Sequence, residues 1–270
     1  MSNASIRIEQ LMLPTYPEPG KEEMPLFSEH RVHQRSTGRP YPNKVTLEVN
    51  REREIERSYT VVHLENEYLD VLVLPEIGGR IFAARDKVTD YDFFYRQHVI
   101  KPGLIGALGS WISGGVEFNW PYHHRPSGFL PCDFETEECG DGSVICWLSE
   151  HDPIDRMKGM VGIVLRPGCA YLETRVKLCN RTPVTKSFLW WENAAVPVNE
   201  SYQIFFPKDV TYVNFHYLDS RISYPIAGDA TFNGIDMTTA RDISWHKNTK
   251  DATSYFACAS QYDFFGGYDH

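Results

Sequence analysis

The sequence predicts an all-β protein, a large antiparallel β-sandwich with few short helices. Short apolar runs bounded by turn residues recur about every ten residues, which is typical of sandwiches and barrels. Polar and apolar residues alternate along 170–178. We expect Glu173, Arg175 and Lys177 on a solvent-exposed face, and Leu172, Val176 and Leu178 on a buried face. No long window repeats its apolar residues with the 3.6-residue period of a helix.

Each expected strand has its own pattern. Residues 45–49 alternate, and the runs 59–64 and 68–74 flank the polar turn 65–67 as a hairpin would. Paired glycines precede the next run, and the later runs are rich in aromatic and β-branched residues. The expected strands are residues 45–49, 59–64, 68–74, 79–84, 92–95, 143–148, 159–165, 170–178, 187–191 and 254–259.

Two regions differ in character. Residues 1–43 contain many prolines and little periodicity, so we expect an extended N-terminal arm that wraps over the domain. Residues 44–270 form the expected sandwich domain. Because residues 264–270 carry no signal that closes the fold, we expect this domain to be truncated at its C-terminal end and to belong to a longer protein.

Composition excludes several classes of partner and cofactor. With 42% hydrophobic residues among 270, the chain can bury a substantial core. A net charge of -9 and the lack of a Lys/Arg block argue against a nucleic-acid partner. The longest apolar runs fall far short of the roughly 20 residues that cross a bilayer, and the start of the chain does not resemble a signal peptide, so we expect a cytoplasmic protein without membrane contact. The six cysteines form no C-x-x-C pair, and we expect neither a metal nor a cofactor.

The segment 114–126 is the first candidate site. Since Pro121 and Pro126 oppose a helix or a central strand, we expect a loop that binds a ligand. Glu117 and Asn119 are two residues apart and can face the same way, and Trp120 offers an aromatic platform for a sugar ring. His123 and His124 are adjacent, so at most one faces a shared site and they do not ligate a metal together. Arg125 completes the set. The alternative is a loop packed by its own aromatics, with histidines on the surface.

Two further positions carry suitable chemistry. Arg80 follows Gly78 and Gly79, which allow a tight turn or a close approach to a ligand; the alternative is an exposed hairpin arginine. Glu192 and Asn193 end an apolar strand, where desolvation would raise the pKa of Glu192 and suit it to general-acid work. The alternative is a glutamate held by an arginine or by water.

In their order along the chain, the segments 75–81, 114–121, 180–183 and 188–193 are similar to those of the galactose mutarotase-like superfamily, which includes aldose 1-epimerases and the sandwich domains of several glycoside hydrolases and lyases. More narrowly, residues 44–270 resemble an uncharacterised mutarotase-like domain at the N-terminus of long bacterial tetratricopeptide-repeat proteins. The resemblance implies a sugar on the concave face of the sandwich and a tetratricopeptide-repeat context in a full-length chain.

The resemblance also implies a histidine acid and a glutamate base for epimerase chemistry. The matching strand reads Trp190-Trp191-Glu192-Asn193 and has no histidine, so ordinary mutarotase chemistry is not expected. Our first hypothesis is a carbohydrate-active domain, a glycoside hydrolase or epimerase relative in which Glu192 and Glu117 act as acid and base. The substrate-binding residues would be Arg80, Asn119, Trp120, His123, His124, Arg125 and Asn193. The second hypothesis is a non-catalytic carbohydrate-binding or assembly module of a longer multidomain protein.

Overall fold

The structure is a computed structural model, and it confirms the all-β prediction. It describes residues 3–17, 54–101, 104–105, 109–110, 112–121, 125, 127–152, 156–215, 221–228, 231–232, 235–236, 239–249 and 254–270. Within these ranges the regular structure is antiparallel strand, apart from a 3-10 turn at His246–Asn248. The chain divides into two compact units, Met1–Val196 and Pro197–His270.

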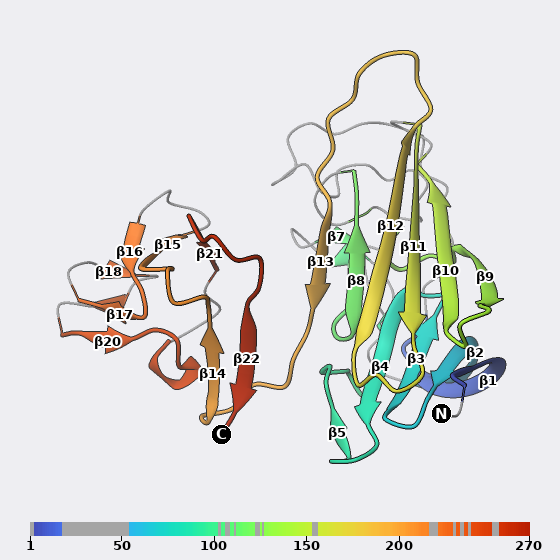
Figure 1. The fold of residues 1–270 in the computed structure, drawn as a ribbon, viewed down its shortest axis with the longest axis horizontal. Coiled ribbons are helices and arrows are strands. Elements are labelled where there is room, and N and C mark those ends of the chain that lie inside the picture. The colour runs from blue at the N-terminus through green and yellow to red at the C-terminus, as the bar shows by residue number, and fades with distance from the viewer. Residues whose placement is uncertain are drawn as a thin grey trace. The chain divides into compact units, whose positions relative to one another are not determined.

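The first unit is a sandwich of two antiparallel sheets (Figure 1). The seven-stranded sheet has the order β1-β2-β3-β4-β8-β13, with β5 paired to β4. Its strands are β1 (Ser5–Thr15), β2 (Ile55–Glu65), β3 (Leu69–Leu74), β4 (Arg80–Asp86), β5 (Tyr91–Asp92), β8 (Val116–Asn119) and β13 (Trp191–Ala194). The four-stranded sheet, in the order β12-β11-β10-β9, consists of β9 (Asp133–Glu138), β10 (Val144–His151), β11 (Met157–Leu165) and β12 (Leu172–Asn180). A small pair joins β6 (Leu104–Ile105) to β7 (Gly109–Ser110).

Both faces of the seven-stranded sheet carry apolar clusters. On the face that we call inner, side chains such as Val71 and Phe118 pack with Val161 and Ile163 of the four-stranded sheet. On the opposite, outer face, a second cluster joins strand residues such as Tyr59 to the side chains of Ile100, Ile112 and Phe129. A fully buried side chain of this kind stabilises the fold by about 1.5–3 kcal/mol. Burial on both faces explains why β3 is continuously apolar, although antiparallel strands commonly alternate.

The N-terminal region expected to be an arm contains a strand. β1 pairs along its whole length with β2 and lies at the edge of the sheet, where Pro14 is tolerated because its missing N–H breaks no ladder. His63 of β2 adds side-chain bonds to Glu9 of β1, at 3.1 Å, and to Asp70 of β3, at 2.5 Å. The rest of the expected arm and the expected strand 45–49 lie outside the described residues.

Three local predictions were wrong, and one of them is the strand expected at 92–95, since β5 consists of Tyr91–Asp92 alone. The segment 114–126, expected to be a loop, includes the strand β8, which lies between β4 and β13. Its prolines do not interrupt the ladder because Pro121 follows the end of the strand. Gly114 and Gly115, at φ 96° and 69°, turn the backbone into it. The strand expected at 187–191 begins only at Trp191.

The second unit consists of short strands around a small core that includes Val213, Ile222 and Ile243. β14 (Tyr202–Phe205) pairs with β22 (Gly266–Asp269), and β15 (Tyr212–Phe215) lies between β16 (Arg221–Ser223) and β21 (Tyr255–Ala257). Two further pairs are β17 (Ile226–Ala227) with β20 (Arg241–Asp242), and β18 (Thr231–Phe232) with β19 (Ile235–Asp236). In the described ranges of both units, no helix is long and apolar enough to cross a membrane.

Candidate functional site

The register between β8 and β13 decides which face each candidate residue occupies. Asn193 is paired with Glu117, and Glu192 is paired with Phe118. Paired residues project to the same side of a sheet, and successive residues project to opposite sides. Since Phe118 is packed in the inner core, Glu192 projects inward and Glu117 projects outward with Asn193.

The two carboxylates expected to act together are therefore on opposite faces of the sheet. A pair of carboxyl groups that cleaves a glycosidic bond must flank the bond from the walls of one pocket. Glu117 and Glu192 do not share a pocket wall in this structure, and their expected pairing as acid and base fails for that reason.

Arg80 is the buried end of a polar cluster on the outer face. Its side chain is 2% exposed, and its Nη1 donates to the carbonyls of Ile112 at 2.6 Å and of Gly114 at 2.8 Å. Its Nη2 lies 3.9 Å from Oε2 of Glu117. Burial lowers the pKa of Arg80 to about 10, while the charge of Glu117 acts in the opposite direction.

Glu117 connects this buried cation to the surface. Its Oε1 accepts a hydrogen bond of 2.9 Å from Nδ2 of Asn193, which is exposed, whereas Glu117 itself is buried. Arg80, Glu117 and Asn193 thus form a continuous line of polar groups from the interior to the solvent.

Arg125 is held by hydrogen bonds to three other parts of the chain. Its backbone N–H donates to Oδ1 of Asn119 at 2.9 Å, and its Nη1 donates to Oε2 of Glu150 at 2.6 Å. Its Nη2 also donates to the carbonyl of Gly78, which ties Arg125 to the turn between β3 and β4. We call Arg80, Glu117, Asn119 and Asn193 the outer polar cluster.

Trp120 does not offer its ring to a ligand. It is 3% exposed, belongs to the inner core and stacks on Trp190 with ring centroids 5.8 Å apart. The guanidinium of Arg125 lies 4.5 Å from the centre of the Trp120 ring. For Trp120, the structure therefore agrees with the alternative interpretation of the segment 114–126, in which its aromatic residues serve packing. His123 and His124 lie outside the described residues.

Several donors of the outer polar cluster and its surroundings are unused. Counting only the described residues as acceptors, Arg80 Nε, Asn119 Nδ2, Arg125 Nε and the hydroxyl of Ser127 are buried without a hydrogen-bond partner. A buried polar group left in this state costs about 1–3 kcal/mol. Buried donors in native proteins nearly always have a partner, so these four are positions where a water molecule or a ligand oxygen can bind.

Glu192 occupies a different environment at the edge of the sandwich. Its Oε1 accepts a hydrogen bond of 2.9 Å from the hydroxyl of Thr174 on β12, so it bridges the two sheets. Desolvation raises the pKa of Glu192, and the bond from Thr174 opposes this shift. The direction agrees with the sequence-based expectation, and the partner in the structure is a threonine rather than the arginine of the alternative reading.

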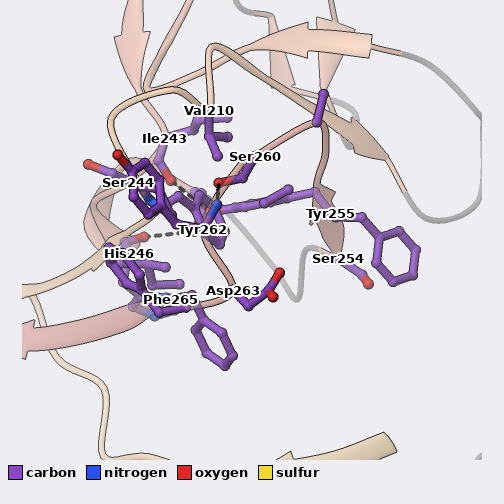
Figure 2. A pocket seen from close by; sticks show the side chains of 18 residues that line it. Val210, Ile243, Ser244, His246, Ser254, Tyr255, Ser260, Tyr262, Asp263 and Phe265 are labelled. Carbon is purple, nitrogen blue, oxygen red and sulfur yellow. Dashed lines mark hydrogen bonds between the residues drawn. The ribbon is translucent and has the colours of Figure 1, made fainter. Parts of the chain in front are cut away.

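The second unit contains a cavity that sequence reasoning did not identify (Figure 2). Its volume is about 850 Å³, and apolar groups such as Val210 and Ile243 line it together with a series of aromatic rings. Asp209 holds one wall by accepting bonds from the hydroxyl of Ser260 at 3.0 Å and from the backbone of Gln261 at 2.7 Å. The aromatic richness of residues 254–268 was the available signal. The aromatic residues of the lining are Phe206, Tyr255, Phe256, Tyr262, Phe264 and Phe265.

Comparison with known proteins gives a family and a fold. Residues 37–270 match the model of a family described as a domain of unknown function, DUF5107. The chain is also similar to the crystal structure of a TPR-domain containing protein from Parabacteroides distasonis ATCC 8503, with 21% identity and a TM-score of 0.79. The match covers 98% of this chain and 42% of that chain. At this identity the likeness shows the fold alone.

Proposed function

The chain belongs to the DUF5107 family, and we propose from the geometry of its site that it is a carbohydrate-binding domain. The sugar lies on the outer face of the seven-stranded sheet, over β4, β8 and β13. The observation that carries this proposal is the line from Arg80 through Glu117 to Asn193, which places an exposed amide beside a buried carboxylate on one face. Sugar hydroxyls both donate and accept, so adjacent amide and carboxylate groups match them well.

The buried part of the outer polar cluster supports the same function. Because two carbonyls hold the guanidinium of Arg80, the carboxylate beside it has a fixed position before any ligand arrives. Positions that are set in advance reduce the entropy lost on binding. The donors of Arg80 and Asn119 that have no partner among the described residues can bond to water or to ligand hydroxyls.

The domain is proposed to bind rather than to hydrolyse. Hydrolysis of a glycoside by two carboxyl groups requires them at roughly 5–10 Å across one pocket. The opposite orientation of Glu117 and Glu192 does not meet this requirement. The galactose mutarotase-like resemblance supports a sugar on the concave face of the sandwich, and we propose that this domain retains that mode of binding.

Calorimetric titration of the chain with a panel of neutral and acidic mono- and oligosaccharides tests the proposal, together with a hydrolysis screen of the same panel. The expected result is saturable binding of at least one sugar with no release of product. Binding accompanied by turnover contradicts the non-catalytic assignment. Failure of every sugar to bind contradicts the proposal as a whole.

A second function, assembly, is favoured by the aromatic cavity of the second unit. Phe264 and Phe265, on the cavity lining, are 55% and 76% exposed. Exposed aromatic clusters of this kind commonly mark interaction surfaces. Because the similar solved protein contains a TPR domain, we propose that the partner is a helix of tetratricopeptide repeats in a longer chain.

Replacing Phe264 and Phe265 by serine tests this second function. The double variant is expected to lose binding to the repeats of the full-length protein while its affinity for sugar stays unchanged. Unchanged association with the repeats contradicts the assembly function.

A further inference from the structure

A second hollow of about 420 Å³ lies on the first unit, and no residue of the outer polar cluster belongs to its described lining. Its polar lining residues are Tyr16, Gln97, His98, Lys101 and Ser113. We propose that this hollow binds an anionic sugar, a uronic acid or a sugar phosphate, with the acidic group of the sugar against Lys101. The inference rests on the proposed carbohydrate-binding function and deepens it by naming the substrate class.

Three segments build the hollow, and backbone hydrogen bonds hold two of them together. Tyr16, just after β1, donates its N–H to the carbonyl of Ile100 at 2.9 Å, and Ile100 donates to the carbonyl of Pro14 at 2.8 Å. The side chain of Gln97 donates to the hydroxyl of Ser113 at 3.3 Å, which joins the third segment. The hollow is therefore built into the fold by residues far apart in sequence.

The outer polar cluster supports one wall of this hollow. Arg80 donates to the carbonyls of Ile112 and Gly114, the two neighbours of Ser113. The same arginine lies beside Glu117, so one buried guanidinium positions both the proposed sugar contacts and the lining of the hollow. The hollow and the proposed sugar contacts on the outer face therefore share one supporting residue, Arg80.

Charge identifies the ligand class. The chain has 36 acidic residues against 27 lysines and arginines, yet the described lining holds Lys101 and His98 and no aspartate or glutamate. A carboxylate or phosphate can therefore approach Lys101 without repulsion from an acidic residue of that lining. The phenol of Tyr16, the amide of Gln97 and the hydroxyl of Ser113 are suited to the hydroxyl groups of a sugar. The volume lies within the usual 300–1,000 Å³ of small-molecule sites.

The test compares charged and neutral sugars of the same stereochemistry by calorimetry at low salt. The wild-type chain is titrated with glucuronate, galacturonate, glucose 6-phosphate, glucose and galactose, and so are the variants Lys101→Gln and Lys158→Gln. Lys158 lies on β11 in the other sheet and serves as the control. Melting temperatures of all three proteins verify that each is folded.

We expect at least one acidic sugar to bind about tenfold more tightly than its neutral counterpart. Lys101→Gln is expected to abolish this preference, and Lys158→Gln is expected to retain it. A preference for glucose 6-phosphate over both uronates would identify phosphate as the acidic group, whereas the reverse would identify a carboxylate.

Equal affinity for acidic and neutral sugars overturns the inference, as does a preference that survives in Lys101→Gln. Either result leaves the proposed function standing, because neutral sugars would still bind. Absence of binding by all five sugars overturns this inference, whereas the proposed function falls only if every mono- and oligosaccharide of the larger panel also fails to bind.

Discussion

Asn193 on β13 donates a hydrogen bond of 2.9 Å from its Nδ2 to Oε1 of Glu117 on β8, directly across the strand pair. The two residues are 76 positions apart in the chain, and only the antiparallel register brings them together. Their contact marks the exposed end of the outer polar cluster, whose buried end is Arg80. The following predictions test the parts of this arrangement separately.

Arg80→Met removes the buried guanidinium and leaves its carbonyl partners and Glu117 without their cation. Removing one partner of a buried ion pair typically costs 3–5 kcal/mol, and we expect a loss of about this size. Urea unfolding of the first unit, followed by tryptophan fluorescence, measures it. Arg85→Gln on the same strand is the control, since its exposed ion pair with Asp90 contributes about 0–1 kcal/mol. Equal losses in the two variants would refute the anchoring role of Arg80.

Gly115→Ala tests the turn that leads into β8. Gly115 has φ 69°, and a β-carbon there would lie 2.1 Å from the carbonyl oxygen of Ile81. Backbone strain and this clash are expected to cost more than about 2 kcal/mol. Gly140→Ala is the control, because a β-carbon at that position meets no atom within 4 Å among those described, and the expected change is within about 0.5 kcal/mol. Thermal melts of both variants measure the difference, and the melting midpoint of Gly115→Ala is expected to be the lower one. Similar midpoints would contradict the prediction.

Glu192 is expected to make stability depend on pH in the opposite direction from an ordinary surface carboxylate. Its pKa is raised above the ordinary value of 4.5 by desolvation, so the folded chain retains a proton that the unfolded chain has lost. Stability contributed by this group is therefore lost as the pH rises from about 4.5 through the raised pKa. Compared with Glu192→Gln, the wild type should lose stability over this window, as measured by urea midpoints at a series of pH values.

Glu173 on the neighbouring strand β12 provides a control of opposite sign. The hydrogen bond from Arg166 holds the pKa of Glu173 below its ordinary value, so its contribution is present above 4.5 and disappears as the pH falls. Compared with Glu173→Gln, the wild type should gain stability as the pH rises. If the difference between wild type and variant followed pH in the same direction at both positions, desolvation would not control the titration of Glu192.

Local patterns in the sequence predicted much of the fold. Strands that alternate or follow clear turn signals, such as β3 and β11, were located nearly to the residue. β8 was missed because prolines beside a short strand suggest a loop, and the sequence does not show that the ladder ends before Pro121. The sequence also did not show which face of each strand is inner and which is outer, because both faces of the seven-stranded sheet are buried.

Contacts between side chains were harder to predict from the sequence than strands were. The two-residue spacing correctly placed Glu117 and Asn119 on one face, because that relation is local. The separation of Glu117 from Glu192 depends on the register between two distant strands, which no local pattern encodes. The same reason explains why Glu150, the partner of Arg125, was not anticipated.

The central claim is that a sugar binds on the outer face of the sheet, and a pair of neighbouring residues on β13 tests it most directly. Asn193→Ala removes an outer-face donor, whereas Glu192→Gln changes the inner face of the same strand. Calorimetric titration of both variants with the sugar that binds the wild type best is the decisive measurement. Loss of one hydrogen bond of about 1 kcal/mol or slightly more predicts an affinity about five- to tenfold weaker for Asn193→Ala and an unchanged one for Glu192→Gln. Weaker binding in Glu192→Gln with normal binding in Asn193→Ala would contradict the account.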